Sequence, residues 1–335
     1  MSYRWLRFLA VPVLALVTPV LATTSAAGQS PVSNTARRPA DVPPTPWGDP
    51  DLQGIWSSSG ATPMERPDEY QGRETLSDED IALIRSETSA RDQRLLLAAA
   101  RRTEAGGNVG AYNNFWMDQG TNVIGTRRTS LIIDPPNGRL PEVTETGRAR
   151  AAANRGSFSS DLPASYTDLS NSDRCLMGFN AGPPMRSAAY NNNVMIFQTP
   201  GYVTILNEMV HNARIIPIGD SASPPFPQYS GVSRGHWEGE TLVIETTQFR
   251  GGSSGLTSPN MHLIERLTRL DPDTVAYEYT ITDPTTYTAP YTVMMPFRRT
   301  DGPLFEYACH EGNIGLYGIL AGARELELQG RELRR

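Results

Sequence analysis

The chain has 335 residues, of which 39% are hydrophobic and 20% charged, so it is long enough for one large or two small domains with a sizeable core. All 30 basic residues are arginine, and the lack of lysine excludes a lysine Schiff base, a pyridoxal phosphate attachment and a P-loop. The formal net charge of -6 argues against a nucleic-acid partner, because phosphate binding requires a basic surface.

The N-terminus has the pattern of a secretory signal peptide. Arg4 and Arg7 precede an apolar run at 9–22, which is too short to cross a bilayer. The small residues at 25–27 fit a cleavage site. We therefore expect residues 1–27 to be removed, leaving a periplasmic or secreted protein without a stable membrane anchor. An uncleaved N-terminal anchor is the alternative.

The sequence of the first half of the mature chain predicts few strands. Residues 28–50 are rich in Pro, Ser, Thr and Ala, which is typical of an extended lead-in. A strand is expected at 51–56, and Ser77 followed by three acidic residues predicts a helix that runs to Arg102. Further along we expect a short strand at 130–134, a helix at 144–154 and an irregular segment at 155–190. Residues 51–190 are together expected to wrap around a β-barrel formed by the second half of the chain.

Residues 191–335 predict an antiparallel β-barrel core with a C-terminal helix. Runs rich in Val, Ile, Thr and Tyr alternate with turn residues at short intervals, as in successive hairpins. Such a meander is best closed into a lipocalin-like barrel, since closure removes the unpaired sheet edges. The fold class is therefore mainly β with accessory helices. The expected strands lie near 194–199, 202–209, 213–218, 241–247, 261–270, 274–282, 289–298 and 303–309, and the helix at 314–333.

Gly54 and Trp56 match the Gly-x-Trp of lipocalin-type barrels. Three positions make a short motif, and we expect Trp56 to be a buried structural residue.

Cys175 and Cys309 are the two cysteines of the chain. In an oxidising compartment an isolated pair is most simply a disulfide. Closing so long a loop would add about 4–5 kcal/mol of stability in the chain-entropy model. Two buried free thiols, or a nucleophilic Cys309 beside His310, are the alternatives.

Five motifs are distributed along the chain: Pro-Asp-Leu-Gln-Gly-Ile-Trp at 50–56, Asp-Pro-Pro-Asn-Gly-Arg-Leu-Pro at 134–141, Arg-Cys-Leu at 174–176, Arg-Gly-His-Trp-Glu-Gly-Glu-Thr-Leu-Val at 234–243 and Tyr-Ala-Cys-His-Glu-Gly-Asn at 307–313. Together they resemble those of a family of secreted bacterial proteins rich in β-structure. The resemblance covers residues 45–328 and implies export and a β-rich body. It brings no established reaction with it, so the chemistry has to be argued from the residues.

The first candidate site consists of Glu208, His211 and Arg214. A tight loop at 210–212 would place Glu208 opposite Arg214 on neighbouring strands, as an ion pair at one mouth of the barrel. His211 would then lie at the loop tip. Such a group can bind an anionic or phenolic substrate and move a proton. A surface ion pair beside an exposed histidine is the alternative.

The second candidate site is His310 with Glu311, because the neighbouring disulfide would hold both residues firmly. His310 is the expected general base, Glu208 or Glu311 its carboxylate partner, and Arg214 the group that binds an anion. The alternative is a structural histidine that seals the end of the barrel.

Aromatic side chains are the expected ligand contacts. Tyr112, Trp116 and Trp237 are assigned to this role, together with His262, which could point into the barrel with Ile264. Ordinary packing in the core or at the rim is the alternative for all of them. The same choice applies to four further aromatic residues: Phe115, Tyr190, Tyr277 and Tyr279.

No metal and no cofactor are predicted, because the sequence contains no His-x-His, His-Glu-x-x-His or Cys-x-x-Cys spacing. The leading hypothesis is an exported enzyme that uses cofactor-free acid–base chemistry, as a lyase, isomerase or hydrolase, on a small hydrophobic or aromatic molecule. A periplasmic binder of hydrophobic small molecules without catalysis is one alternative, and a metal-dependent enzyme is another.

Overall fold

Residues 42–97, 126–153, 163–220, 224–251 and 258–331 are described by a computed structural model. They belong to one unit of the chain, Thr35–Arg335. The predicted signal peptide lies outside the described residues, as do Tyr112, Phe115 and Trp116. Within the described ranges, no helix combines the length and the apolar character that crossing a bilayer requires.

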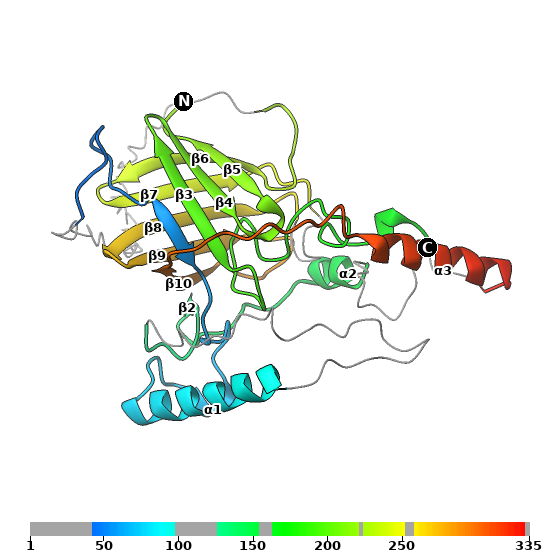
Figure 1. The fold of residues 1–335 in the computed structure, drawn as a ribbon, viewed down its shortest axis with the longest axis horizontal. Coiled ribbons are helices and arrows are strands. Elements are labelled where there is room, and N and C mark those ends of the chain that lie inside the picture. Colours follow the sequence, from blue (N-terminus) through cyan, green and yellow to red (C-terminus); the bar gives the residue numbers. More distant parts are fainter. Residues whose placement is uncertain (1–41, 98–125, 154–162, 221–223, 252–257, 332–335) are drawn as a thin grey trace, which may run out of the picture. The chain divides into compact units, whose positions relative to one another are not determined.

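One ten-stranded antiparallel sheet curls into a nearly closed barrel (Figure 1). Nine strands follow the order β5-β4-β3-β1-β10-β9-β8-β7-β6, and β2 pairs with β10 outside this path. The strands are β1 (Gly54–Ser57), β2 (Ile132–Asp134), β3 (Asn193–Thr199), β4 (Tyr202–Asn207), β5 (Ala213–Pro217), β6 (Val232–Glu238), β7 (Thr241–Thr247), β8 (His262–Asp271), β9 (Thr274–Thr282) and β10 (Tyr291–Arg299).

The barrel closes where β5 meets β6, at a parallel bridge between Ile218 and Gly235. The amide of Gly219 donates a hydrogen bond to the Gly235 carbonyl at 2.9 Å. A Cβ atom at position 235 would lie 2.7 Å from Cδ1 of Ile218, so a larger side chain would have to displace the Ile218 side chain. Beside this seam lies a hollow of about 430 Å³, to which Arg214 and Ser233 contribute.

The predicted mainly β fold with a closed antiparallel barrel is confirmed, but the strand order differs from a simple meander. β1 inserts between β3 and β10, so a strand from the first half of the chain is part of the barrel. β6 supplies another strand, and the expected strand at 303–309 is wrong. That segment does not pair in the sheet because the amide of Phe305 donates to the Glu208 carboxylate, at 2.9 Å, in place of a strand carbonyl.

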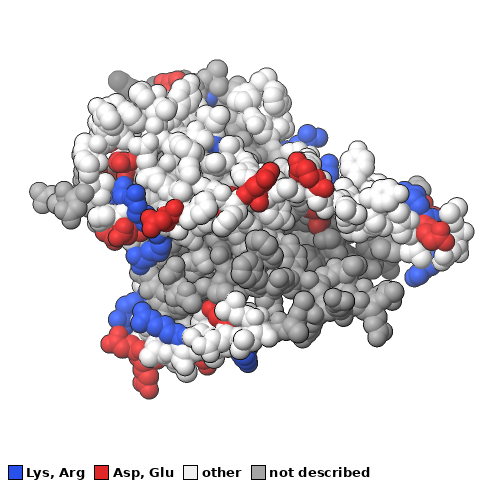
Figure 2. All heavy atoms as spheres, in the orientation of Figure 1, with Lys and Arg blue, Asp and Glu red and all other residues white. Residues whose placement is uncertain are grey.

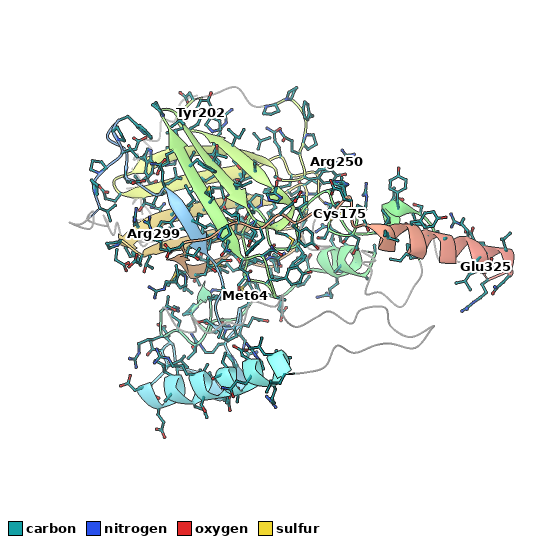
Figure 3. The ribbon with its side chains drawn as sticks, in the orientation of Figure 1. Met64, Cys175, Tyr202, Arg250, Arg299 and Glu325 are labelled. Atoms are coloured by element: carbon teal, nitrogen blue, oxygen red, sulfur yellow. A yellow bond between two sulfur atoms is a disulfide. The ribbon has the colours of Figure 1, made fainter. Side chains whose placement is uncertain are left out.

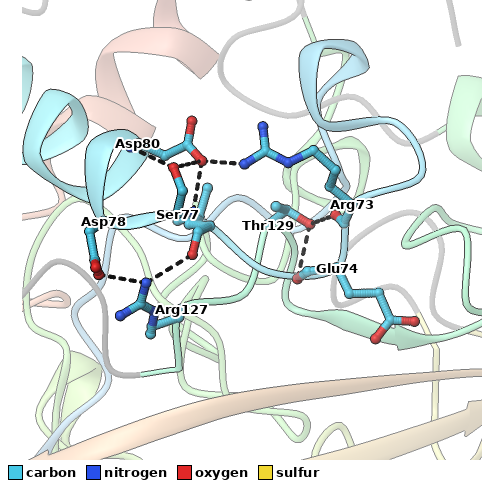
Figure 4. A network of polar contacts seen from close by, with 8 residues as sticks. Arg73, Glu74, Ser77, Asp78, Asp80, Arg127 and Thr129 are labelled. Atoms are coloured by element: carbon cyan, nitrogen blue, oxygen red, sulfur yellow. Dashed lines mark hydrogen bonds and ion pairs between the residues drawn. The ribbon is translucent and has the colours of Figure 1, made fainter.

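Three α-helices lie outside the barrel: α1 (Asp78–Leu97), α2 (Glu145–Ala153) and α3 (Ile314–Leu328), which ends before the predicted Leu333. The start of α1 follows the sequence signal. Ser77 Oγ accepts from the Asp80 amide at 3.1 Å, and Asp80 Oδ2 accepts from the Ser77 amide at 2.8 Å (Figure 4). Arg73 pairs with Asp80. Short 3-10 helices occur at Asp68–Tyr70 (η1), Tyr166–Asp168 (η3) and Met209–His211 (η4).

Alternate residues of the strands fill the barrel interior. On β8 the inward positions are Leu263, Glu265 and Leu267, all fully buried, while the residues between them are partly exposed. The rings of Tyr277 and Phe297 stack in the interior with centroids 4.9 Å apart. The centre of the barrel is therefore a packed core, and space for a ligand has to be sought at its ends.

One end of the barrel is sealed by Trp56, Arg269 and Arg299, here called the closed end. The Trp56 ring is fully buried, as predicted, and its Nε1 donates to the Leu52 carbonyl at 3.0 Å. The Arg269 guanidinium lies 5.2 Å from the centroid of this ring and donates to the carbonyls of Asp51, at 2.9 Å, and Pro272, at 2.7 Å. Burial lowers the pKa of Arg269, and the charge of Asp51 offsets this only in part.

Candidate functional site

The opposite end of the barrel contains a cavity of about 180 Å³, and we call it the open end. It lies where β8 and β10 begin and β9 finishes. Figure 3 labels Cys175 near this end and Arg299 at the closed end. The lining residues come from β9, from β10 and from the segments around them: Met64, Leu140, Met177, Gly178, Phe179, Gly182, Pro183, Pro184, Arg186, Met261, Tyr279, Ile281, Tyr287 and Tyr291.

Three tyrosines supply polar groups of the cavity. Tyr279, Tyr287 and Tyr291 are all buried, and the rings of Tyr287 and Tyr291 meet edge to face with centroids 5.1 Å apart. The hydroxyls of these two residues also share a hydrogen bond. Burial raises the pKa of each of the three phenols, and the positive charge of Arg186 opposes that shift. The hydroxyls therefore stay protonated at neutral pH and can donate hydrogen bonds.

Arg186 is the one charged residue among the described residues that line the cavity. Its backbone amide donates to the Asn180 carbonyl at 3.1 Å, which fixes the chain at this point. Its guanidinium forms no ion pair with any residue that the structure describes, and the residue is exposed. An unpaired guanidinium therefore stands at the mouth of an aromatic cavity.

The loop that carries Arg186 is held from both sides. Gly182 has a φ of +72°, and a Cβ atom there would lie 2.3 Å from the Pro184 carbonyl carbon, so the turn requires glycine. The next part of the loop is fixed from the barrel interior, because the Met185 amide donates to the Tyr277 hydroxyl at 3.0 Å. The wall of the cavity is thus tied to β9.

The predicted disulfide between Cys175 and Cys309 is confirmed. It joins the segment before the cavity wall to the segment before α3. Asn313, the N-cap of α3, adds a hydrogen bond from its Nδ2 to the Asp173 carbonyl at 2.8 Å. Met177, which lines the cavity, lies two residues after Cys175, so the disulfide supports the wall from outside.

A buried polar group inside the barrel involves Arg214, Glu265 and Tyr277. Arg214 forms a two-pronged ion pair with Glu265, in which Nη2 lies 2.9 Å from Oε1. The Tyr277 hydroxyl donates to the same Oε1 at 2.6 Å. Burial opposes the charge on Arg214, but the adjacent Glu265 carboxylate raises the pKa of Arg214 above its usual value. Burial likewise raises the pKa of Tyr277 well above its usual value.

The predicted ion pair between Glu208 and Arg214 is therefore wrong. In the register of β4 and β5, Arg214 lies opposite Ile205, and Glu208 belongs to the turn that leads into η4. Glu208 is buried and accepts hydrogen bonds from the amides of Phe305, at 2.9 Å, and Asn193, at 3.3 Å. Its carboxylate holds the chain at 305 against the barrel. His211 is exposed at the end of η4.

His310 and Glu311 are both exposed in the turn before α3, and neither lines the cavity. Within the described residues, no side-chain hydrogen bond or ion pair joins any two of Glu208, His211, Arg214, His310 and Glu311. The structure does not bring the predicted catalytic residues together into one site.

The predicted ligand contacts lie elsewhere as well. His262 does not point inward with Ile264, because the inward face of β8 carries Leu263 and Glu265. Its Nε2 lies 2.6 Å from Glu245 Oε1 on the barrel exterior. Trp237 packs against the core and is not a lining residue of the cavity, while Tyr112 and Trp116 lie outside the described residues. No group of three potential metal ligands occurs in the described ranges.

Sequence comparisons add no relative: no protein-family model and no curated protein matches the chain. Among solved structures, the chain is similar to a single-residue variant of the fluorescent protein UnaG, at 15% identity and a TM-score of 0.22, over 33% of this chain and 72% of that chain. A second UnaG variant matches at 14% identity and a TM-score of 0.23, over 40% and 90% of the two chains. Similarity of this extent says nothing about what this chain binds.

Proposed function

We propose that the protein binds a small aromatic molecule in the cavity at the open end of the barrel. The observation that carries this proposal is the lining, which combines three buried tyrosine rings with apolar side chains such as Met261 and Ile281. The volume of about 180 Å³ sets the size of the ligand. An apolar cavity of about 150 Å³ accommodates benzene, whereas sites for drug-sized ligands measure about 300–1,000 Å³. A single substituted ring fits this range.

Binding is favoured over catalysis because of where the acid–base groups lie. A general base has to be within hydrogen-bond reach of the proton that it removes. His211 and His310 are exposed and outside the cavity lining. The three lining phenols have raised pKa values, so they are protonated at neutral pH and cannot take up a proton as a base. The proposed function is therefore binding of a small molecule without catalysis, which the sequence left open as an alternative to an enzyme.

Export is part of the same proposal. The Cys175–Cys309 disulfide supports an oxidising compartment, such as the periplasm or the cell exterior. The likeness of the five motifs to a family of secreted bacterial proteins points the same way. On the face drawn in Figure 2, acidic and basic side chains are interspersed, so that face offers no basic surface for phosphate groups.

A titration of the full mature chain with phenol tests the proposal. We expect saturable binding by isothermal titration calorimetry, and we expect Ile281→Trp to abolish it because the larger side chain fills the cavity. The matched control is Ile264→Trp, since Ile264 lies on the outward face of β8. Circular dichroism verifies that both variants fold. Unsaturable binding, or equal affinity in the folded Ile281→Trp variant, would contradict the proposal.

A further inference from the structure

We infer that the cavity selects a small aromatic carboxylate, whose negative charge is held by Arg186 and whose ring lies among the tyrosines. This inference rests on the proposed aromatic site and adds to it the charge of the ligand. The starting observation is that the cavity has one cationic side chain and no anionic one among its described lining residues.

Two buried arginines of the barrel, Arg214 and Arg269, contrast with Arg186. Arg214 is neutralised by the Glu265 carboxylate, and Arg269 donates to backbone carbonyls while its guanidinium faces the Trp56 ring. Both are thus satisfied inside the protein. Arg186 has no ion pair with a described residue, and its guanidinium retains the planar set of donors that matches a carboxylate.

The tyrosine hydroxyls add neutral donors to the same cavity. Because burial raises the pKa values of Tyr279, Tyr287 and Tyr291, these phenols carry no negative charge that would repel an anion. A carboxylate oxygen accepts strong hydrogen bonds from neutral donors as well as from a guanidinium. The hydrogen bond between Tyr287 and Tyr291 uses one of these protons, and the remaining hydroxyls can donate to an anion in the cavity.

Acidic groups near the tyrosines are already engaged. Glu65 Oε1 accepts from the Leu140 amide at 2.9 Å. Asp283 accepts from the hydroxyls of Thr285, at 2.7 Å, and Thr286, at 2.6 Å. Neither carboxylate lines the cavity, and the Glu265 charge is balanced by Arg214. Arg186 therefore remains the one charged side chain that a ligand would meet among the described residues lining the cavity.

Size and charge together favour a carboxylate over a phosphate. A single guanidinium balances a single negative charge, whereas a phosphate monoester carries between one and two at neutral pH. The cavity has room for one ring with a small planar substituent. Benzoate meets both conditions, and benzamide has nearly the same shape without the charge.

The test compares benzoate with benzamide by isothermal titration calorimetry on the full mature chain. We expect benzoate to bind about tenfold more tightly than benzamide, as hydrogen bonds to charged groups do relative to neutral ones. Arg186→Gln should weaken benzoate binding about tenfold and leave benzamide binding unchanged. The matched control is Arg324→Gln, which removes the same charge from the exposed face of α3 and should leave both affinities unchanged.

Each outcome separates this inference from the proposed function. Equal affinities for the two ligands, or an Arg186→Gln variant with unchanged benzoate affinity, would overturn the choice of a carboxylate while leaving an aromatic site in place. If neither benzoate, benzamide nor phenol binds, the aromatic site itself is wrong. Because Arg186 is exposed, its replacement is expected to preserve the fold, and near-ultraviolet circular dichroism checks this.

Discussion

The two ends of the barrel use the same kinds of side chain in opposite ways. At the closed end, Trp56 is fully buried and Arg269 is covered by the indole ring and by backbone carbonyls. At the open end, tyrosine rings surround a cavity and the Arg186 guanidinium is exposed without an ion pair to a described residue. An arginine whose donors are all used by the protein stabilises the fold, whereas one whose donors remain free is available to a ligand.

The largest expected effect comes from removing the Cys175–Cys309 disulfide, which lies next to the cavity wall at the open end. We expect Cys175→Ser combined with Cys309→Ser to lower the free energy of unfolding by about 4–5 kcal/mol, since the denatured chain is no longer cross-linked. Urea denaturation measures this loss. Reduction of the wild type with dithiothreitol should reproduce it and should leave the double variant unchanged. An unaltered urea midpoint after reduction would show that the bond contributes nothing.

Trp56→Ala tests the closed end. We expect a loss of about 3–5 kcal/mol in the free energy of unfolding, because a large buried ring is removed and Arg269 loses its cover. The benzoate affinity of the folded protein should not change, since Trp56 is remote from the cavity lining. Trp47→Ala is the matched control and should change stability by no more than about 0.5 kcal/mol, because Trp47 is exposed. A parallel loss of benzoate affinity would mean that the two ends are coupled.

Tyr277→Phe sharpens the comparison from the middle of the barrel. Its hydroxyl donates to Glu265 and accepts from the Met185 amide in the cavity wall. Removing the hydroxyl leaves the Met185 amide without this partner and takes one donor from Glu265, which keeps its ion pair with Arg214. The loss should cost about 1–3 kcal/mol in the free energy of unfolding and should also weaken benzoate binding. Thermal denaturation and calorimetry measure the two effects. Tyr202→Phe, at an exposed position, is the control, and a stability loss without any change in affinity would refute the link to the wall.

The smallest expected effect concerns alkaline stability. Burial raises the pKa values of Tyr279 and Tyr291 in the folded protein above the value of about 10 in the unfolded chain. The folded state then retains protons that the unfolded state releases, so stability falls as the pH rises above about 10, by at most about 1.4 kcal/mol per pH unit for each tyrosine.

Urea denaturation between pH 9 and 11 tests this dependence. Tyr291→Phe should make the decline of stability with pH shallower, whereas Tyr317→Phe, on the exposed surface of α3, should not. Identical slopes in the wild type and in Tyr291→Phe would contradict the expectation.

The local elements of the fold could be predicted from the sequence because their signals are local. Runs rich in Val, Ile, Thr and Tyr define β7 to β9 closely, and Ser77 with Asp80 defines the start of α1. The position of β1 between β3 and β10 could not be predicted, because pairing between strands so distant in the chain leaves no local pattern. The segment at 303–309 is rich in strand-forming residues, yet the buried Glu208 takes the Phe305 amide out of the sheet.

The site was harder to predict for the same reason. The chain has only four histidines, and three of them were predicted to be site residues. The structure places His262 on the barrel exterior and His211 and His310 at exposed turns. Tyr279 was recognisable as an aromatic residue suited to a ligand. Arg186 lies in a segment without periodicity, and Glu265 is 51 residues from Arg214. One sequence signal could have indicated the buried ion pair: Glu265 is a carboxylate between Leu263 and Leu267 on the inward face of β8, where it needs a partner.

The seam between β5 and β6 has a consequence for how the barrel comes apart. Most neighbouring strands share longer antiparallel ladders, and the short β1–β10 ladder, which pairs Trp56 with Arg299 and Ser57 with Arg298, is at least regular. The described contacts across the seam centre on Ile218, Gly219 and Gly235. Fluctuations should therefore part the wall along this line first, and deuterium should enter the amides of β5 sooner than those of β9. Opening of the seam would turn β5 and β6 into edge strands with unpaired backbone groups, and β5 carries the exposed Ile215. Other molecules could pair with these edges, so aggregation on mild heating should begin here.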